Sequence, residues 1–429
     1  MERDRPHPAG STLRKALGPG LLMAAAAVGV SHLVQSTRAG AEYGLLLLPV
    51  VLLACLLKYP FLEFGPRYAA ATSENLLVGY RRLGRWALWL FGLVTVGTMF
   101  IVLAVVTLVT AGLAGLLLGI DASPLQISVG VLALCIALLA LGNYRGLDLA
   151  MKLLVCLLTV STLLALLLAL GKTPDWSGLS GLDRLPDLGT AAGIAFLLAL
   201  VGWMPIPVEA AAWSSLWTRE RAAQTGHAPS LAEALLDFRL GYLGTVVLAV
   251  AFVMLGALLM HASGLQFADS AVGFSGQLVE LYASGLGDWS RPLITIAALS
   301  TMFSTTLAVA DAYPRVLAAI VDAGRGGDSR TASAAGGRLG YLCSLGLVSA
   351  GALLVLMFAG EGFTRLIDFA TTLSFVAAPL IAWITLRAVT ASHVPPEARP
   401  GPALLTLAWL GLGSGALFSL AWIGWRLAT

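Results

Sequence analysis

Long apolar stretches follow one another along this chain, and short polar or Gly- and Pro-containing segments separate them. Most stretches are about 20 residues or longer, the length an α-helix needs to cross the hydrocarbon core of a bilayer. A helix also satisfies its own backbone hydrogen bonds, which lipid cannot do. The pattern predicts an all-α integral membrane protein with about eleven transmembrane helices. Their ranges are roughly 17–41, 44–71, 86–118, 125–142, 150–170, 189–217, 239–261, 291–323, 339–358, 363–390 and 403–427.

The segments between the spans are too short for a soluble domain. Three of them, about 172–188, 218–238 and 262–290, are long enough to hold short helices. Residues 1–16 are polar and Pro-containing and lack the layout of a cleaved signal. We expect them to form a cytoplasmic N-terminal tail.

Two spans contain interruptions. The first carries Gly29-Val30-Ser31-His32 inside its apolar run, and the sixth carries Gly202-Trp203-Met204-Pro205-Ile206-Pro207. Proline removes a backbone donor and clashes with the preceding turn, so the two prolines must open the sixth helix. Interrupted segments at matching positions in two halves indicate an inverted-repeat transporter. The alternative is an ordinary kink in a structural helix.

The substrate site is expected between the two interruptions, near the bilayer midplane. The candidate substrate-binding residues are Gly29, Val30, Ser31, His32 and Gln35 in the first span and Gly202, Trp203, Met204 and Pro205 in the sixth.

Composition agrees with a membrane protein, since 58% of the residues are hydrophobic and 11% are charged, against roughly a quarter charged in soluble domains. The basic residues lie in short loops and form no stripe for nucleic acid. With a cytoplasmic N-terminus, the inside segments hold about 19 of the 26 Lys and Arg residues. This asymmetry predicts a plasma-membrane protein with its N-terminus in the cytoplasm and, for an odd number of spans, its C-terminus outside.

No cofactor, metal cluster or catalytic motif is indicated. The four cysteines lie in apolar segments without CxxC spacing, so we expect buried free thiols. None of the five histidines forms HExxH, and no phosphate-binding glycine loop is present. These absences argue against an enzyme and a primary pump. A channel is the closer alternative to a carrier, because unwound backbone can line a filter.

Ionisable side chains within spans are candidates for coupling or gating. Glu209 lies one turn beyond Met204-Pro205 and could relay a proton or pair with Lys58 or Arg315. The candidates are Lys58, Glu209 and Asp311. Two i,i+4 pairs, Asp311 with Arg315 and Glu63 with Arg67, also read as structural ion pairs on one helix face.

Two segments, one in the first span and one in the sixth, resemble the NRAMP family of proton-coupled divalent metal transporters. Leu17-Gly18-Pro19-Gly20 looks like the family's opening LGPG, followed without a gap by Ala39–Tyr43 on its AGAxY, and Met204-Pro205 looks like the start of its MPH motif. The resemblance implies a LeuT-like fold with a five-plus-five inverted repeat, broken helices 1 and 6, and one extra helix. The repeats would cover 17–170 and 189–390, and the extra helix 403–427.

The chain departs from this family at the residues that hold the metal. On the gapless match, the DPGN motif falls on Gly29 to His32, so that Gly29 replaces the metal-binding Asp and His32 the Asn. Ile206 replaces the His of MPH, and Met204 is the ligand that remains. The third span, 86–118, lacks the ionisable residues of the family's proton path.

These departures bear on the substrate. Manganese, ferrous and magnesium ions need oxygen or nitrogen ligands with a carboxylate to offset charge, and an unpaired buried charge costs several kcal/mol or more. His32 with Met204 would suit copper(I) better, and a hydrogen-bonded structural His32 is an equal alternative. The N-termini of half-helices favour anions, with Ser31, His32, Gln35 and Arg38 as further donors.

We therefore expect a transporter that works by alternating access on a small anion, such as bicarbonate or a small carboxylate, or on a small polar solute. The coupling ion would be H⁺ or Na⁺. In LeuT-like transporters, sodium often binds between the first break and hydroxyls of the eighth span, an arrangement that Thr305 and Thr306 resemble. Hydroxyls bonded to their own helix are the alternative. A divalent metal transporter and a channel remain open.

Overall fold

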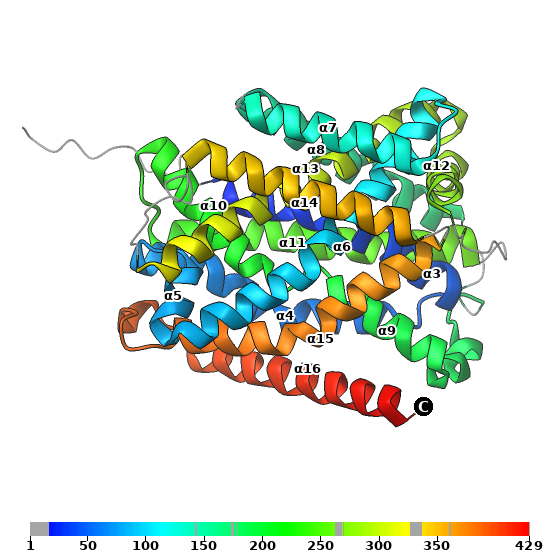
Figure 1. Ribbon diagram of the computed structural model, residues 1–429. Helices are drawn as coiled ribbons and strands as arrows, with labels where there is room; N and C mark the ends of the chain where they lie inside the picture. Colours follow the sequence, from blue (N-terminus) through cyan, green and yellow to red (C-terminus); the bar gives the residue numbers. More distant parts are fainter. Residues whose placement is uncertain are drawn as a thin grey trace, which may run out of the picture.

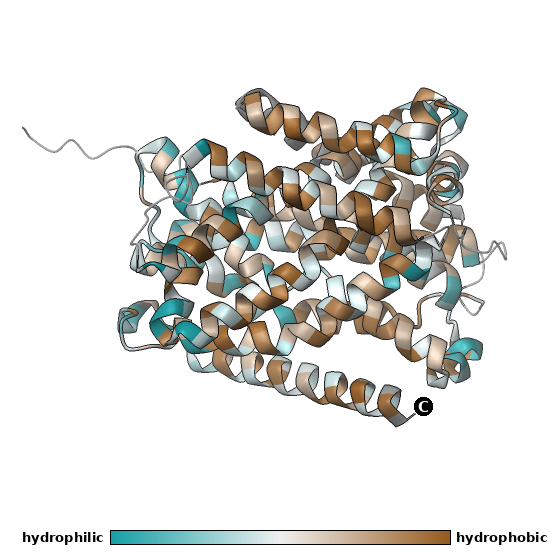
Figure 2. Cartoon of the chain, viewed as in Figure 1, coloured by the Kyte–Doolittle hydropathy of each residue, from teal (hydrophilic) through white to brown (hydrophobic). Residues whose placement is uncertain are grey.

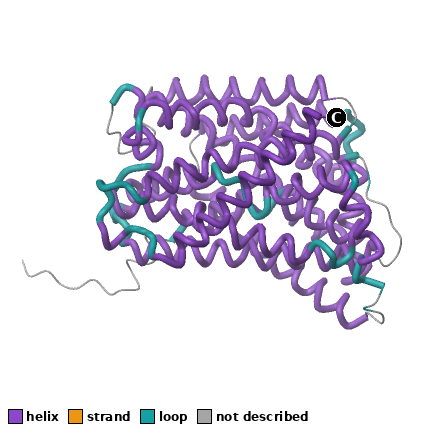
Figure 3. The backbone as a smooth tube through the Cα atoms, turned by 90° about the horizontal axis from the view of Figure 1, so that it is seen from below, coloured by secondary structure: helices purple, strands orange, loops and turns teal. Residues whose placement is uncertain are grey.

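The computed structural model describes residues 17–141, 144–172, 176, 178–261, 268, 270–326, 337–359 and 362–428. The predicted tail, 1–16, lies outside them. All regular secondary structure in these residues is helical (Figures 1 and 3). The α-helices are α2 (Pro19–Ala27), α3 (Thr37–Tyr43), α4 (Leu48–Thr72), α5 (Leu76–Leu83), α6 (Arg85–Leu118), α7 (Pro124–Leu141), α8 (Tyr144–Lys172), α9 (Ala191–Trp203), α10 (Ala210–Thr225), α11 (Leu231–Leu255), α12 (Ala271–Leu286), α13 (Arg291–Gly324), α14 (Gly337–Ala359), α15 (Phe363–Val389) and α16 (Pro402–Ala428). Two π-helical segments, Ser31–Ser36 and Gly256–Met260, precede α3 and continue α11, and short 3₁₀ helices cover Leu182–Gly189, Asp288–Ser290 and Pro396–Ala398.

Eight helices are long and apolar enough to cross a membrane, or up to ten if each of two bent pairs is one span. A shorter apolar helix, Cys156–Gly171, falls on the predicted fifth span. Apolar residues cover the middle of the bundle, and hydrophilic residues gather towards the helix ends (Figure 2). The all-α membrane fold is confirmed, and the count of eleven spans stays a prediction. The long connections hold the helices Leu182–Gly189 and Ala271–Leu286, as expected.

Both predicted breaks are present. The first span divides into α2 and the continuous stretch Ser31–Tyr43, with a bend of 46° between them. In the sixth, α9 ends at Trp203 and α10 begins at Ala210, so the segment with both prolines is not helical. The breaks leave backbone carbonyl and N–H groups without helical partners in the middle of the bundle.

The start of the first span is fixed by α11. The carboxylate of Asp237 accepts hydrogen bonds from Gly18 N (3.1 Å) and Gly20 N (2.6 Å), two N–H groups at the N-terminal end of α2. A Cβ on Gly20 would lie 2.1 Å from the carbonyl oxygen of Asp237, so only glycine permits this contact. The Gly-Pro-Gly sequence thus allows close packing of α2 on α11 and leaves two donors for the carboxylate.

All four cysteines are free, as expected. Cys55 and Cys135 are buried, but Cys156 and Cys343 are exposed on the surface of the bundle. The prediction of burial is wrong for these two, because an apolar membrane helix can turn a small thiol towards lipid as easily as towards protein.

Candidate functional site

A cavity of about 30 Å³ lies between the two breaks, with α6 and α13 as its other walls. A water molecule needs at least roughly 10–15 Å³ measured this way, so only a very small ligand fits in this cavity. The first span contributes Val30 and Ser31, the sixth contributes Trp203 and Pro205, and α13 contributes Thr305. The structure therefore brings these five predicted residues together around one space.

Hydroxyl groups cover the carbonyl end of α2. Thr305 Oγ1 donates to Ala25 O (2.9 Å) and lies 3.4 Å from Val28 O. Ser31 Oγ lies 2.8 Å from Ala27 O and 3.1 Å from Pro205 O, so it also links the two breaks. Of the carbonyls that a bound cation would use at this end, Ala25 O therefore already has a donor from the chain, the hydroxyl of Thr305.

His32 points away from the cavity. Its side chain is fully buried, and its Nε2 lies 2.9 Å from Thr245 O on α11. Because a carbonyl only accepts, Nε2 carries a hydrogen, and Nδ1 of a neutral ring then accepts from Ser31 Oγ at 2.7 Å. Nε2 thus holds the broken segment against α11, and Nδ1 bonds to Ser31 within that segment. His32 therefore has the structural role that was the alternative to metal binding.

Gly29 and Met204, which align with two metal ligands of the resembled family, are not among the residues that line the cavity. A Cβ on Gly29 would lie 2.8 Å from Thr305 Cγ2, so α13 fills the space that a longer side chain would need. Met204 is fully buried, and its sulfur lies 4.0 Å from Ser36 Oγ. In the part of the chain that the structure describes, no three His, Cys, Asp or Glu residues gather as metal ligands.

Glu209 lies just after the sixth-span break and is 5% exposed. Tyr313 Oη donates to its Oε1 at 3.1 Å, and Thr98 Oγ1 lies 3.4 Å from its Oε2. The residues one turn from these hydroxyls, Val102 on α6 and Val309 on α13, line the cavity. The carboxyl group is therefore one helical turn from the cavity, between the same two helices. The ring of Tyr313 also packs edge-on against Trp213, with centroids 5.4 Å apart, and closes this side.

The partners suggested for Glu209 lie elsewhere. Lys58 Nζ donates to Val201 O (2.6 Å) and Gly202 O (2.7 Å) at the end of α9. Arg315 pairs with Asp311 (2.7 Å) and Glu220 (3.6 Å).

Two expected i,i+4 ion pairs are confirmed. Asp311 contacts Arg315, and it also accepts from Tyr341 Oη at 2.7 Å. Glu63 contacts Arg67 at 2.6 Å.

Thr306 and Gln35 face away from the break. Thr306 lies against α6, where its hydroxyl is 2.8 Å from Thr110 Oγ1. Gln35 Nε2 donates to Asp368 Oδ1 at 3.1 Å.

Asp368 on α15 is not among the site residues predicted from the sequence. Both of its carboxylate oxygens accept from Arg38 Nη1 at 2.9 Å, which joins the second half of the first span to α15. Arg38 also contacts Glu42 (2.8 Å) and lies over the ring of Phe196. Trp203 Nε1 makes a second link to α15, to Ser374 Oγ at 2.8 Å. A carboxylate inside the tenth predicted span was the available signal.

Comparison with protein-family models matches residues 20–423 to Nramp, described as natural resistance-associated macrophage protein-like. The chain belongs to the Nramp family. The protein PM0681 of Pasteurella multocida (strain Pm70), named as uncharacterized, is 34% identical over 420 residues. These residues cover 96% of this chain and 93% of that protein. The family assignment made from the short motifs is therefore confirmed.

Solved structures agree on the fold. A mutant of the Eremococcus coleocola manganese transporter matches with a TM-score of 0.72 and 16% identity, covering all of this chain and 90% of that chain. A transporter of the nucleobase-cation-symport-1 family, in a closed conformation with bromovinylhydantoin bound, matches with a TM-score of 0.57 and 16% identity over 98% of this chain and 95% of that one. The LeuT-like fold is thus confirmed. As a member of a family of transporters and not of enzymes, this Nramp protein is a secondary transporter of an ion or small solute in a membrane.

Proposed function

We propose that this Nramp-family protein carries a small anion, such as bicarbonate or a small carboxylate, or a small polar solute, by alternating access through the cavity between its two breaks. The observation that supports this most is the arrangement of donors at the half-helix ends. A metal carrier needs free oxygen ligands at the carbonyl ends of its broken helices. In this chain, hydrogen-bond donors of the protein lie at those ends.

The carbonyl ends of both broken spans have protein partners. At the end of α2, Thr305 donates to Ala25 O, and at the end of α9, Lys58 donates to Val201 O. The residues lining the cavity include no carboxylate. A dehydrated divalent ion would keep both of its charges in a low-dielectric space, at a cost of several kcal/mol or more. Divalent metal transport is therefore the weaker alternative, although a family relative of known structure is named as a manganese transporter.

The N-terminal ends of the helices that follow the two breaks favour negative charge. The outer half of the first span begins at Val30, and the first N–H groups of a helix have no acceptor within it. Val30 and Ser31 line the cavity, so these groups and the positive end of the helix dipole can meet an anionic or carbonyl oxygen there. At the start of α10, the N-cap residue is Glu209, but its side chain bonds to no backbone N–H group there.

For coupling, we favour a proton on Glu209 over sodium at Thr305. Glu209 is a buried carboxyl whose bonds are to two neutral hydroxyls, and protonation removes its charge. Thr305 Oγ1 lies within bonding distance of Ala25 O and of Thr301 O on its own helix, so the packing of α13 on α2 accounts for this hydroxyl without a sodium ion. The cytoplasmic N-terminus and extracytoplasmic C-terminus follow from the distribution of Lys and Arg.

Uptake into proteoliposomes tests the substrate. We expect saturable, gradient-driven uptake of radiolabelled bicarbonate, formate or acetate. Ser31→Ala should lower it about tenfold, because one hydrogen bond in a small dry site contributes on the order of 1.5 kcal/mol. Ser128→Ala is the matched control, since Ser128 also bonds the carbonyl four residues back, on α7 outside the cavity. Robust manganese uptake at micromolar concentration would overturn the anion proposal, and non-saturating flux would indicate a channel.

The contact between Arg38 and Asp368 should hold the outer side closed. Both residues are partly exposed, at 15% and 27% of their side chains, so the pair stabilises closure by no more than about 1 kcal/mol. We expect Asp368→Asn to raise external thiol labelling of a cysteine placed at Val30 up to about fivefold. Glu280→Gln, which removes an ion pair with Arg291 at the surface, should leave labelling unchanged. Equal labelling in both variants would show that the Arg38 contact is no gate.

A further inference from the structure

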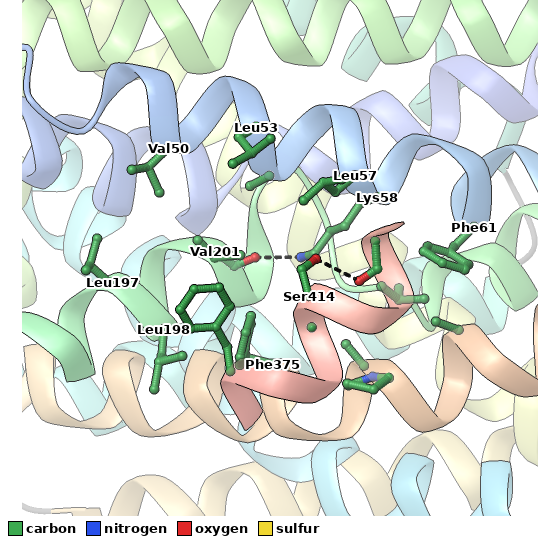
Figure 4. A pocket seen from close by; sticks show the side chains of 18 residues that line it. Val50, Leu53, Leu57, Lys58, Phe61, Leu197, Leu198, Val201, Phe375 and Ser414 are labelled. Carbon is green, nitrogen blue, oxygen red and sulfur yellow. Dashed lines mark hydrogen bonds between the residues drawn. The ribbon is translucent and has the colours of Figure 1, made fainter. Parts of the chain in front are cut away.

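Lys58, in the middle of α4, directs its ammonium group at the carbonyl end of α9 (Figure 4). The sequence makes these carbonyls available. Pro205 has no N–H group for the usual bond to Val201 O, which accepts instead from Met204 N at 3.3 Å. Since α9 ends at Trp203, Gly202 O lacks a helical partner. Such an end carries a partial negative charge. The ammonium, 2.6 and 2.7 Å from the two oxygens, is thus bound as a cation would be.

Among the residues that the structure describes, no carboxylate forms an ion pair with this ammonium. Beside it lies a cavity of about 310 Å³ between α4, α9, α15 and α16, lined mainly by aliphatic and aromatic groups such as Leu57 and Phe375. Lys58 is the only ionisable residue among those that line it, and Ser414 carries the only other polar side chain. On its own helix, the titratable neighbours are the thiol of Cys55, one turn before it, and the hydroxyl of Tyr59, the next residue. Lys58 therefore depends on the two carbonyls for its electrostatic balance.

We propose that Lys58 is a built-in cation of the broken sixth helix, which occupies the place at the carbonyl end of α9 where a small monovalent cation could otherwise bind. Half-helix C-termini and unwound carbonyls are where broken-helix transporters coordinate cations. Here the cation is tethered to α4, so it cannot leave with the substrate. It fixes α9 to α4, because withdrawing α9 would leave an ammonium group in an apolar cavity. Lys58 is in this sense a positioning residue.

The test asks whether a free cation can replace the tethered one. Lys58→Ala removes the ammonium and opens space beside Val201 O and Gly202 O. We expect the purified variant to melt several degrees below the wild type in choline chloride. Methylammonium, butylammonium or Na⁺ should raise its melting temperature in a saturable way, as a ligand that binds only the folded state does. The wild type should not respond to these ions.

Leu57→Ala is the matched control, since it enlarges the same cavity from the same helix without a change of charge. It should lower the melting temperature without any specific response to cations. Lys58→Met keeps most of the side-chain volume and removes the charge, so it should also melt below the wild type and stay unresponsive. The proposal is wrong if Lys58→Met is as stable as the wild type, or if Lys58→Ala responds to cations no more than Leu57→Ala does. These measurements need no substrate, so a failure of the anion proposal would leave them interpretable.

Discussion

Replacing Glu209 by glutamine is expected to abolish proton-driven accumulation of substrate while exchange of substrate across the membrane continues. The amide has nearly the same shape and its oxygen can still accept from Tyr313, while its NH₂ group faces Thr98 Oγ1 as a donor. It can neither bind nor release a proton. A buried carboxylate without a cationic partner costs several kcal/mol, so we expect Glu209 to carry a proton while the site is closed and to release it when water enters. We predict that a pH gradient drives uptake by the variant at least tenfold less than by the wild type.

Two further variants make this result specific. Tyr313→Phe removes the hydroxyl 3.1 Å from Glu209 Oε1 but leaves the carboxyl group, so accumulation should persist with a shifted pH profile. Glu397→Gln changes a carboxylate in the exposed 3₁₀ helix Pro396–Ala398 and should have no effect. The measurements are uptake against an imposed pH gradient and counterflow without one. Accumulation by Glu209→Gln that still follows the pH gradient would exclude Glu209 as the proton carrier.

The breaks could be predicted from the sequence because their cause is local. Pro205 and Pro207 cannot donate backbone hydrogen bonds, and the apolar run of the first span is interrupted at Gly29. Most helix boundaries in the structure fall close to the predicted ones for the same reason, since hydropathy and Gly or Pro punctuation act over a few residues. The connection predicted over 218–238 differs, because α10 continues to Thr225 and α11 begins at Leu231 with residues too polar for a hydropathy signal. The π-helical segment Ser31–Ser36 gave no such signal, because it depends on bonds to α11 and to the sixth span.

Side-chain partners at the site could not be predicted, because they come from distant parts of the chain. Tyr313 is 104 residues from Glu209 in sequence, and Asp368 is 330 residues from Arg38. Charge alone suggested that Glu209 pairs with Lys58, yet the dipole of an opened helix attracts the lysine to carbonyl oxygens instead. Direction matters as well, since His32 sits in the predicted segment but bonds to Thr245 outside the cavity.

Gly202 belongs to the sixth-span break, and it also allows close packing of α9 on α15. A Cβ there would lie 2.0 Å from the carbonyl oxygen of Thr371 on α15 and 3.3 Å from Phe375 Cβ. The first distance is far inside van der Waals contact and involves backbone, which cannot rotate away. Close approach of two membrane helices through a small residue is a main source of their association.

Gly202→Ala should therefore force α9 and α15 apart and destabilise the protein by about 1–3 kcal/mol or more. Because Gly202 O also holds Lys58, we expect the variant to lose transport together with several degrees of melting temperature. Gly97→Ala is the matched control, since nothing lies within 4 Å of its added methyl group on α6. Alanine also favours helix by up to about 1 kcal/mol over glycine, so this control should melt at or slightly above the wild-type temperature. If the melting temperature falls in Gly202→Ala and stays or rises in Gly97→Ala, close contact of α9 with α15, and not glycine flexibility, determines the residue at position 202. Equal changes in melting temperature would mean that the break tolerates a wider separation of these helices.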